Sequence, residues 1–184
     1  MWTKEILLAL ANKPKIDGET LLLVDVSGSM LLAYGQRRSR LDVAIEIAIE
    51  LKERCESLTI YASGGSDSEK TDSTEKVPDY YGEQLDASLR RGIQALGGGG
   101  LYARQAIDYI SHYELKPDLL VILTDDTTET PKAYGKTCVQ INLDKSLNTE
   151  GFLEFSPKDF WSWLETSYLN LPTNSPMNNL AGTA

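Results

Sequence analysis

Continuous apolar runs and segments of helical periodicity alternate along most of the chain. Two runs are long and uninterrupted, LLLV at 21–24 and LLVIL at 119–123, and an aspartate follows each of them closely. Runs of this kind are typical of parallel strands that are covered on both faces. We therefore predict buried strands over about 20–26 and 118–124.

Elsewhere the apolar residues recur at steps of three and four, which indicates amphipathic helices. The helices are expected at about 2–12, 41–54, 84–96, 102–113 and 157–169. Shorter runs predict strands at 58–62 and 137–143, with a weak edge strand near 74–77 inside the polar segment 64–79. Because strands alternate with helices, we predict an α/β fold in three layers, α-β-α, with a mostly parallel central sheet of six elements.

The length of 184 residues fits one domain. We expect it to cover 1–171, with the helix at 2–12 packed on it and a flexible tail over 172–184 rich in Asn, Pro and small residues. The apolar stretch near the N-terminus is far too short for a membrane span. We therefore expect a cytoplasmic protein that does not contact membranes.

The formal net charge of −9 repels phosphate backbones, so direct binding of nucleic acid is not expected. Arg37, Arg38 and Arg40 form a local basic cluster, which we interpret as part of a solvated loop. Cys55 and Cys138 do not have the spacing of metal ligands, and we interpret both as buried thiols in a reducing compartment.

The sequence DVSGSM, at the end of the first buried strand, carries the most specific chemistry. Asp25, Ser27 and Ser29 alternate along it, so their oxygens can converge on one point while Gly28 lets the backbone bend. Asp125 follows the other buried strand, and the carboxyl ends of parallel strands share one edge of a sheet. Carboxylate and hydroxyl oxygens are ligands of Mg²⁺, with Mn²⁺ or Ca²⁺ as substitutes in vitro. We predict a divalent-metal site formed by Asp25, Ser27, Ser29 and Asp125, completed by water or by a partner's oxygen.

DVSGSM followed by VILTDD resembles the motifs of von Willebrand factor A (vWA) domains. Their metal-ion-dependent adhesion site (MIDAS) uses DxSxS, a threonine from a later loop, and the aspartate of a strand-ending Thr-Asp such as Thr124-Asp125. The stretch LANKP followed by GETLLLVDVSGSM also resembles the entry to the vWA-like domain of the Ro autoantigen (TROVE) family. Proteins of that family carry a ring of helical repeats that binds small RNAs. We expect no such ring here, so RNA binding does not transfer.

The chain departs from the vWA pattern at the loop threonine. The corresponding segment reads LGGGGLYA, with Gly99 or Gly100 where the threonine is expected. Glycine has no side-chain oxygen, so the resemblance implies either that water replaces this ligand, that metal affinity is lower, or that the site has lost its metal.

The sequence motifs give little support to an enzymatic function. The glycine run is followed by no Lys-Ser/Thr, which excludes a P-loop, and His112 has no nucleophile near it in sequence. Metal-dependent phosphoryl transfer through an aspartate needs a second carboxylate two residues on, where this chain has Ser27. Trp161 and Trp163 flank an aromatic cluster with Phe155 and Phe160 that we interpret as core, although an exposed ring there or at Trp2 would mark a contact surface.

We therefore expect a binding module without enzymatic activity, in which the metal captures an acidic group of a partner protein. Two alternatives stay open at this stage. One is a metal-independent structural subunit of a Ro-like ribonucleoprotein or of another assembly. The other is a regulator of an ATPase machine, in the way that some intracellular vWA proteins act.

Overall fold

The computed structural model describes residues 4–66, 71–96, 99–127, 130–144 and 149–170. Its core is a six-stranded sheet in the order β5-β4-β1-β6-β7-β8. The strands are β1 (Ile16–Asp25), β4 (Cys55–Ser66), β5 (Thr71–Lys76), β6 (Leu119–Thr124), β7 (Thr137–Asn142) and β8 (Leu153–Phe155). In this sheet, among the described residues, only β5 pairs in the antiparallel direction. The mostly parallel sheet predicted from the sequence is confirmed.

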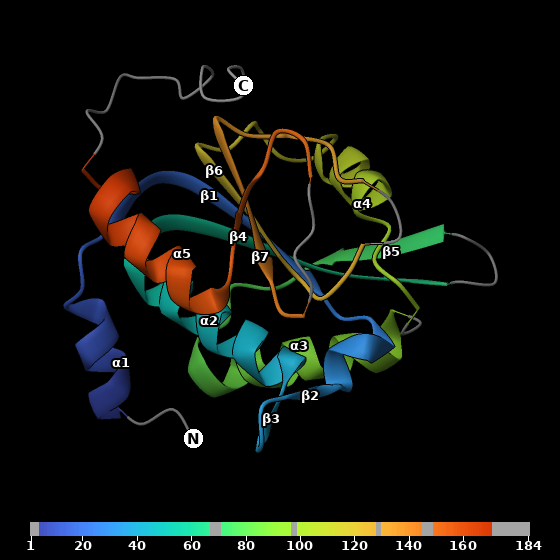
Figure 1. The fold of residues 1–184 in the computed structure, drawn as a ribbon, viewed down its shortest axis with the longest axis horizontal. Helices are drawn as coiled ribbons and strands as arrows, with labels where there is room; N and C mark the ends of the chain where they lie inside the picture. Colours follow the sequence, from blue (N-terminus) through green and yellow to red (C-terminus); the bar gives the residue numbers. More distant parts are fainter. Residues whose placement is uncertain (1–3, 67–70, 97–98, 128–129, 145–148, 171–184) are drawn as a thin grey trace.

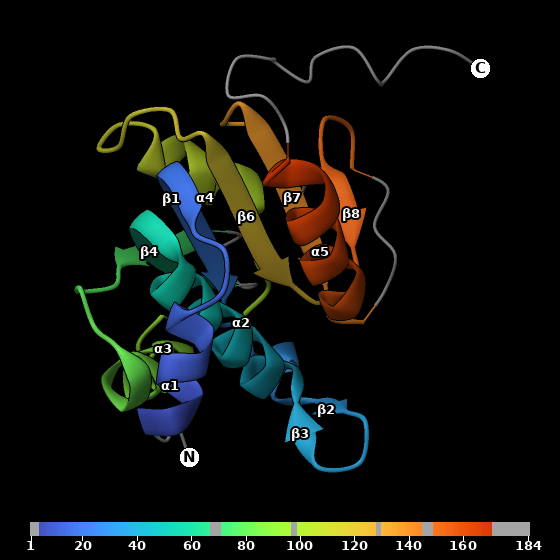
Figure 2. The same cartoon turned by 90° about the vertical axis from the view of Figure 1, so that its left-hand side faces the viewer.

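Helices cover both faces of the sheet, as Figures 1 and 2 show. They are α1 (Lys4–Ala11), α2 (Arg40–Arg54), α3 (Gly82–Ala95), α4 (Ala103–Ile110) and α5 (Pro157–Trp163), which continues as a π-helix over Leu164–Tyr168. Leu22 and Val24 point into the core beneath α2, α3 and α5, whereas Leu21 and Leu23 face α4. The uninterrupted apolar run of β1 exists because both faces of this strand are buried.

The start of α2 is fixed by a capping box. Ser39 accepts a hydrogen bond from the backbone N–H of Asp42, and the Asp42 side chain accepts one from the N–H of Ser39. This arrangement satisfies two otherwise unpaired donors at the helix end. It makes Arg40 the first residue of the helix, directly after the small hairpin of β2 (Ala33–Tyr34) and β3 (Arg38–Ser39).

The structure differs from the sequence predictions mainly at its edges. The strand predicted at 58–62 extends over Cys55–Ser66, and the weak edge strand lies at Thr71–Lys76, where it forms a hairpin with β4. The bend expected at Gly28 is a 3₁₀ turn over Gly28–Leu31, whereas the strands β2, β3 and β8 were not predicted. All three are short, and hydrophobic periodicity needs several residues to show.

Two predictions concern residues outside the described part of the chain, namely the tail over 172–184 and the exposure of Trp2. Of the two thiols expected to be buried, Cys138 is buried and Cys55 is only partly so, because it begins a strand near the sheet edge. Within the described residues, no helix is long and apolar enough to cross a membrane.

Candidate functional site

Three neighbouring strands end at the same edge of the sheet, and a carboxylate follows or ends each of them. Asp25 is the last residue of β1, Asp125 follows β6, and Asp144 lies two residues beyond β7. The strands are parallel and adjacent in the order β1-β6-β7. Ligands of open α/β sheets bind beyond this end of the strands.

Asp25 is fully buried. The backbone N–H of Ser27 donates to its Oδ1 at 2.7 Å, and the hydroxyl of Thr124 lies 2.7 Å from its Oδ2. No cation contacts it among the described residues. Burial is the main cause that raises the pKa of Asp25 to about 7, with a smaller contribution from the nearby charge of Asp125, while the bonds from Thr124 and Ser27 lower it.

The Thr124 hydroxyl lies between Asp25 and the backbone of Asp126. The Thr124 hydroxyl lies 2.6 Å from the carbonyl oxygen of Asp126 and accepts from the Asp126 N–H at 3.1 Å. Because a hydroxyl has one proton, it cannot donate both to this carbonyl and to Asp25. Donation from Thr124 to Asp25 Oδ2 therefore competes with donation to the carbonyl of Asp126.

The two serines connect the end of β1 to the end of β6. The hydroxyls of Ser27 and Ser29 are 3.0 Å apart, and Ser29 Oγ donates to Asp125 Oδ1 at 3.0 Å. The 3₁₀ turn at Gly28–Leu31 brings Ser29 toward the neighbouring strand end. The structure thus places the four residues predicted from the sequence in one cluster, while their role as metal ligands stays a prediction.

Arg40 enters this cluster, which corrects its interpretation as part of a solvated loop. Its side chain is only 12% exposed, and it donates from Nη1 to Asp125 Oδ2 at 2.5 Å and from Nη2 to Asp144 Oδ2 at 2.8 Å. Arg38 does lie on the surface, where it pairs with Glu46, and Arg37 is exposed. The difference arises because Arg40 begins α2, whose N-terminus lies close to the strand ends.

Sequence reasoning missed Arg40 and Asp144. Asp144 was within reach of the rule that led to Asp125, because it also follows a predicted strand. Arg40 has no such signal, since its contact with Asp125 joins residues 85 positions apart in the chain. Gly99 and Gly100, where the vWA resemblance leads us to expect a threonine, lie against the end of β4; Gly65 N–H donates to Gly100 O at 3.0 Å and Gly99 N–H to Gly65 O at 2.7 Å.

The donor set fits a small divalent cation on two conditions. Asp25, Asp125 and the two serine hydroxyls are hard oxygen ligands of the kind that Mg²⁺ binds. Asp25 must be ionised, and Asp125 must release Arg40. Within the described residues, no three Asp, Glu, His or Cys side chains form a metal cage, so hydroxyls and water would have to supply most of the coordination shell.

Comparison with known proteins identifies the fold. The structure matches the crystal structure of the Ro protein (RSR) of Deinococcus radiodurans with a TM-score of 0.62 and 15% sequence identity. The chain has a Ro-like fold. The match covers 81% of this chain and 33% of that protein, so the chain spans about a third of its length. At this identity the similarity shows the α/β three-layer fold alone.

A second match is to the pilus adhesin SpaC of Lactobacillus rhamnosus GG, at 15% identity over 62% of this chain and 16% of that one. Its TM-score of 0.31 is too low to support an argument. No protein-family model matches the sequence, and no curated protein is detectably similar to it.

Proposed function

We propose that the chain is a binding module whose strand-end cluster takes up a divalent cation and, through it, an acidic group of a partner protein. The observation that carries the proposal is the convergence of Asp25, Ser27, Ser29 and Asp125 at one sheet edge. The cation, when bound, would supply an open coordination position for a carboxylate. The proposal assigns no bond-making or bond-breaking step to this chain.

The chain's own residues have distinct parts in this proposal. Asp25 and Asp125 supply negative charge, and the hydroxyls of Ser27 and Ser29 supply neutral ligands, so the site does not exceed the charge of the ion. Thr124 orients Asp25. Arg40 holds Asp125 while no cation is bound, and Asp144 can retain the guanidinium after Asp125 is released.

Thermal unfolding tests the metal. Wild type and Asp25→Ala are compared in EDTA and across a titration of MgCl₂ and MnCl₂. Because a ligand that binds only the folded state stabilises it by mass action, the melting temperature of the wild type should rise with metal and that of the variant should not. No rise at millimolar metal would refute the proposal.

The acidic partner is tested with displayed random peptides, selected in Mg²⁺ and eluted with EDTA. We expect recovered peptides to share an Asp or Glu whose replacement by Asn or Gln abolishes binding. Recovery of peptides without an essential carboxylate would refute this part of the proposal.

One observation favours a second candidate, a metal-independent structural subunit of a Ro-like assembly. Arg40 already neutralises Asp125 without any metal, and the fold is similar to that of the matched third of a Ro protein. A wild type that ignores Mg²⁺ yet unfolds when Arg40 is replaced would support this candidate.

A further inference from the structure

The outer edge of β4 is left open along the first part of the strand. β1 lines the inner edge from Cys55 to Ser63, whereas β5 pairs only with the part from Tyr61 to Ser66. Beyond the pairing of β4 with β5, one further backbone hydrogen bond follows among the described residues: Val77 N–H donates to the carbonyl of Ile60 at 2.9 Å. Pro78 follows and has no N–H to extend the pairing. Among the described residues, no strand pairs with the outer edge over 55–59.

Two hydrogen bonds show which backbone groups face this open edge. The carbonyl of Ser63 accepts from Val26 N–H on the side of β1, and the carbonyl of Ile60 accepts from Val77 N–H on the opposite side. Backbone groups alternate along a strand. The N–H and C=O groups of Glu56 and Leu58 therefore point away from β1, at the spacing that an added strand would match.

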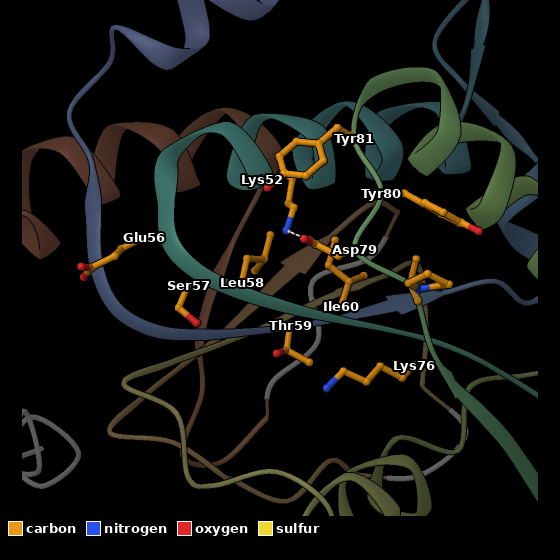
Figure 3. Close-up of a pocket in the computed structure, with 12 residues that line it drawn as sticks. Lys52, Glu56, Ser57, Leu58, Thr59, Ile60, Lys76, Asp79, Tyr80 and Tyr81 are labelled. Atoms are coloured by element: carbon orange, nitrogen blue, oxygen red, sulfur yellow. Dashed lines mark hydrogen bonds and ion pairs between the residues drawn. The ribbon is translucent and has the colours of Figure 1, made fainter.

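A groove of about 360 Å³ lies along this edge, and Figure 3 shows the side chains that line it. On the side of α2 and α3 lie Leu58 and Tyr81; Tyr81 is 52% exposed, and the Lys52 ammonium is 4.7 Å from the centre of its ring. On the other side of the strand lie Thr59 and Lys76. The first wall thus combines Leu58 and the Tyr81 ring with the Lys52–Asp79 ion pair, and the other wall is polar.

We propose that this edge receives an extended segment of another protein, which adds to the sheet as a strand beside Cys55–Thr59. Free backbone groups at strand spacing recognise an extended chain, and pockets for alternate side chains give specificity. The segment would place apolar residues toward Leu58 and Tyr81 and polar residues toward Thr59 and Lys76.

Charge distinguishes this occupant from a second copy of the chain. Each copy carries a net charge of −9, so two copies repel each other as they approach. Within the groove Asp79 pairs with Lys52, and Lys76 pairs with Glu114. Glu56 is exposed at the rim, where its carboxylate accepts only a 3.3 Å hydrogen bond from Gly18 N–H among the contacts of the described residues. This carboxylate and the net charge of the chain favour a segment that carries basic residues.

The test begins with displayed random linear peptides, selected on the wild-type chain in EDTA so that the metal site takes no part. The strongest binder is synthesised with and without N-methyl groups on the residues that would face β4. Amide hydrogen exchange is then followed by NMR. Exchange at Leu58 should slow by about tenfold or more on binding, whereas Thr59, whose amide faces β1, should not change. The methylated peptide should bind at least about tenfold more weakly.

A proline substitution provides the matched protein control. Glu56→Pro removes one edge N–H, and Cys55, with φ −75° and ψ 140°, already has a conformation that a following proline accepts. Glu56→Ala keeps the N–H and loses only the side chain. We expect the proline variant to bind the peptide at least about fivefold more weakly than the alanine variant, with circular dichroism confirming that both are folded.

Several outcomes would overturn the proposal. These are the recovery of no peptide, a bound peptide that leaves Leu58 exchange unchanged, and equal affinity for the methylated peptide. Dimerisation of the free chain that Glu56→Pro abolishes would identify a second copy as the occupant. Binding that appears only after deletion of 171–184 would identify the chain's own C-terminal segment.

Discussion

An arginine that contacts carboxylates lies at each end of α2, and the two arginines differ in how deeply they are buried. Arg54, the last residue, is fully buried, and its guanidinium bonds Pro14 O, Glu50 and Glu165 at 3.2 Å each. It also lies 5.1 Å from the centre of the Trp161 ring. Arg40, the first residue, is partly exposed and contacts Asp125 and Asp144.

The comparison separates a structural ion pair from an exchangeable one. Arg54 connects the segment after α1, α2 itself and the π-helix, and no solvent reaches it. Its charge also lies at the helix C-terminus, where the dipole favours cations, whereas Arg40 lies at the N-terminus, where the dipole opposes them. Arg40 therefore costs less to release, and its partner Asp125 belongs to a set of oxygens that suits a metal.

The largest expected effect concerns Asp25, the carboxyl at the Arg40 end that no cation among the described residues contacts. Its pKa of about 7 in the folded chain lies above the reference value of 3.8. The folded chain thus holds a proton that the unfolded chain releases, and the free energy of unfolding falls as the pH rises from about 4 to 7. Asp25→Asn mimics the neutral acid and lacks this loss. In EDTA, the free energy of unfolding of Asp25→Asn relative to that of wild type should rise by about 4 kcal/mol from pH 4 to pH 8. Urea denaturation at each pH measures this difference.

A constant difference between wild type and Asp25→Asn across this pH range would contradict the prediction. Mg²⁺ should act in the opposite direction in the wild type. Because the metal needs the ionised carboxylate, its stabilising effect should grow as the pH rises through 7 and be absent in Asp25→Asn.

The next effect tests the structural end of α2. Arg54→Met removes the cation between Glu50 and Glu165 and should lower the free energy of unfolding by about 3 kcal/mol. Lys13, which bonds Glu50 at 2.6 Å, limits the loss. The loss should be the same with and without Mg²⁺ in urea denaturation. A loss that Mg²⁺ reverses would show that the two arginines do not differ as described.

A smaller effect is expected at the other end of α2. Arg40→Met leaves Asp125 buried without its cation and should lower the free energy of unfolding by about 2 kcal/mol in EDTA. This loss is smaller than that of Arg54→Met because the second partner of Arg40, Asp144, remains solvated. Mg²⁺ should restore most of this loss and bind the variant about tenfold more tightly than wild type. Arg38→Met, at an exposed pair with Glu46, is the control and should change stability by less than about 0.5 kcal/mol. Equal Mg²⁺ affinity in wild type and Arg40→Met, measured by calorimetry, would count against the exchange.

The smallest effect on stability is expected for Ser29→Ala. Ser29 is exposed, and its hydroxyl bonds Asp125 and Ser27 at 3.0 Å each. The variant should lose less than about 1 kcal/mol in EDTA but bind Mg²⁺ about tenfold more weakly, since one ligand is missing. Unchanged Mg²⁺ affinity would remove Ser29 from the proposed ligand set.

The sequence predicted the parts of this molecule that long hydrophobic patterns determine. The runs ending at Val24 and Leu123 predicted the two central strands, and strand direction then placed Asp25 and Asp125 at one edge of the sheet. Short elements escaped, because β8 and the hairpin of β2 and β3 have too few residues to show a period. Extra pairing with β5 likewise lengthened β4 beyond its apolar run.

The neutralisation of the site was beyond sequence reasoning for a different reason. Whether Arg40 is solvated depends on where the capping box starts α2 and on how close that end lies to β6, which are tertiary properties. The same holds for Asp25, whose pKa depends on its burial. Residue types therefore indicated the proposed metal ligands. Only the packing of α2 against the strand ends revealed that Arg40 competes with a metal for Asp125.

The most direct test of the exchangeable site uses Mn²⁺, whose unpaired electrons broaden nearby NMR signals. Amide signals of the wild type and of Arg40→Met are recorded during a titration with Mn²⁺ at pH 8. The account predicts selective broadening at Ser27, Ser29 and Asp125, at lower Mn²⁺ concentration in the variant, and its reversal by excess Mg²⁺. Signals at these residues that stay sharp in both proteins at millimolar Mn²⁺ would contradict it.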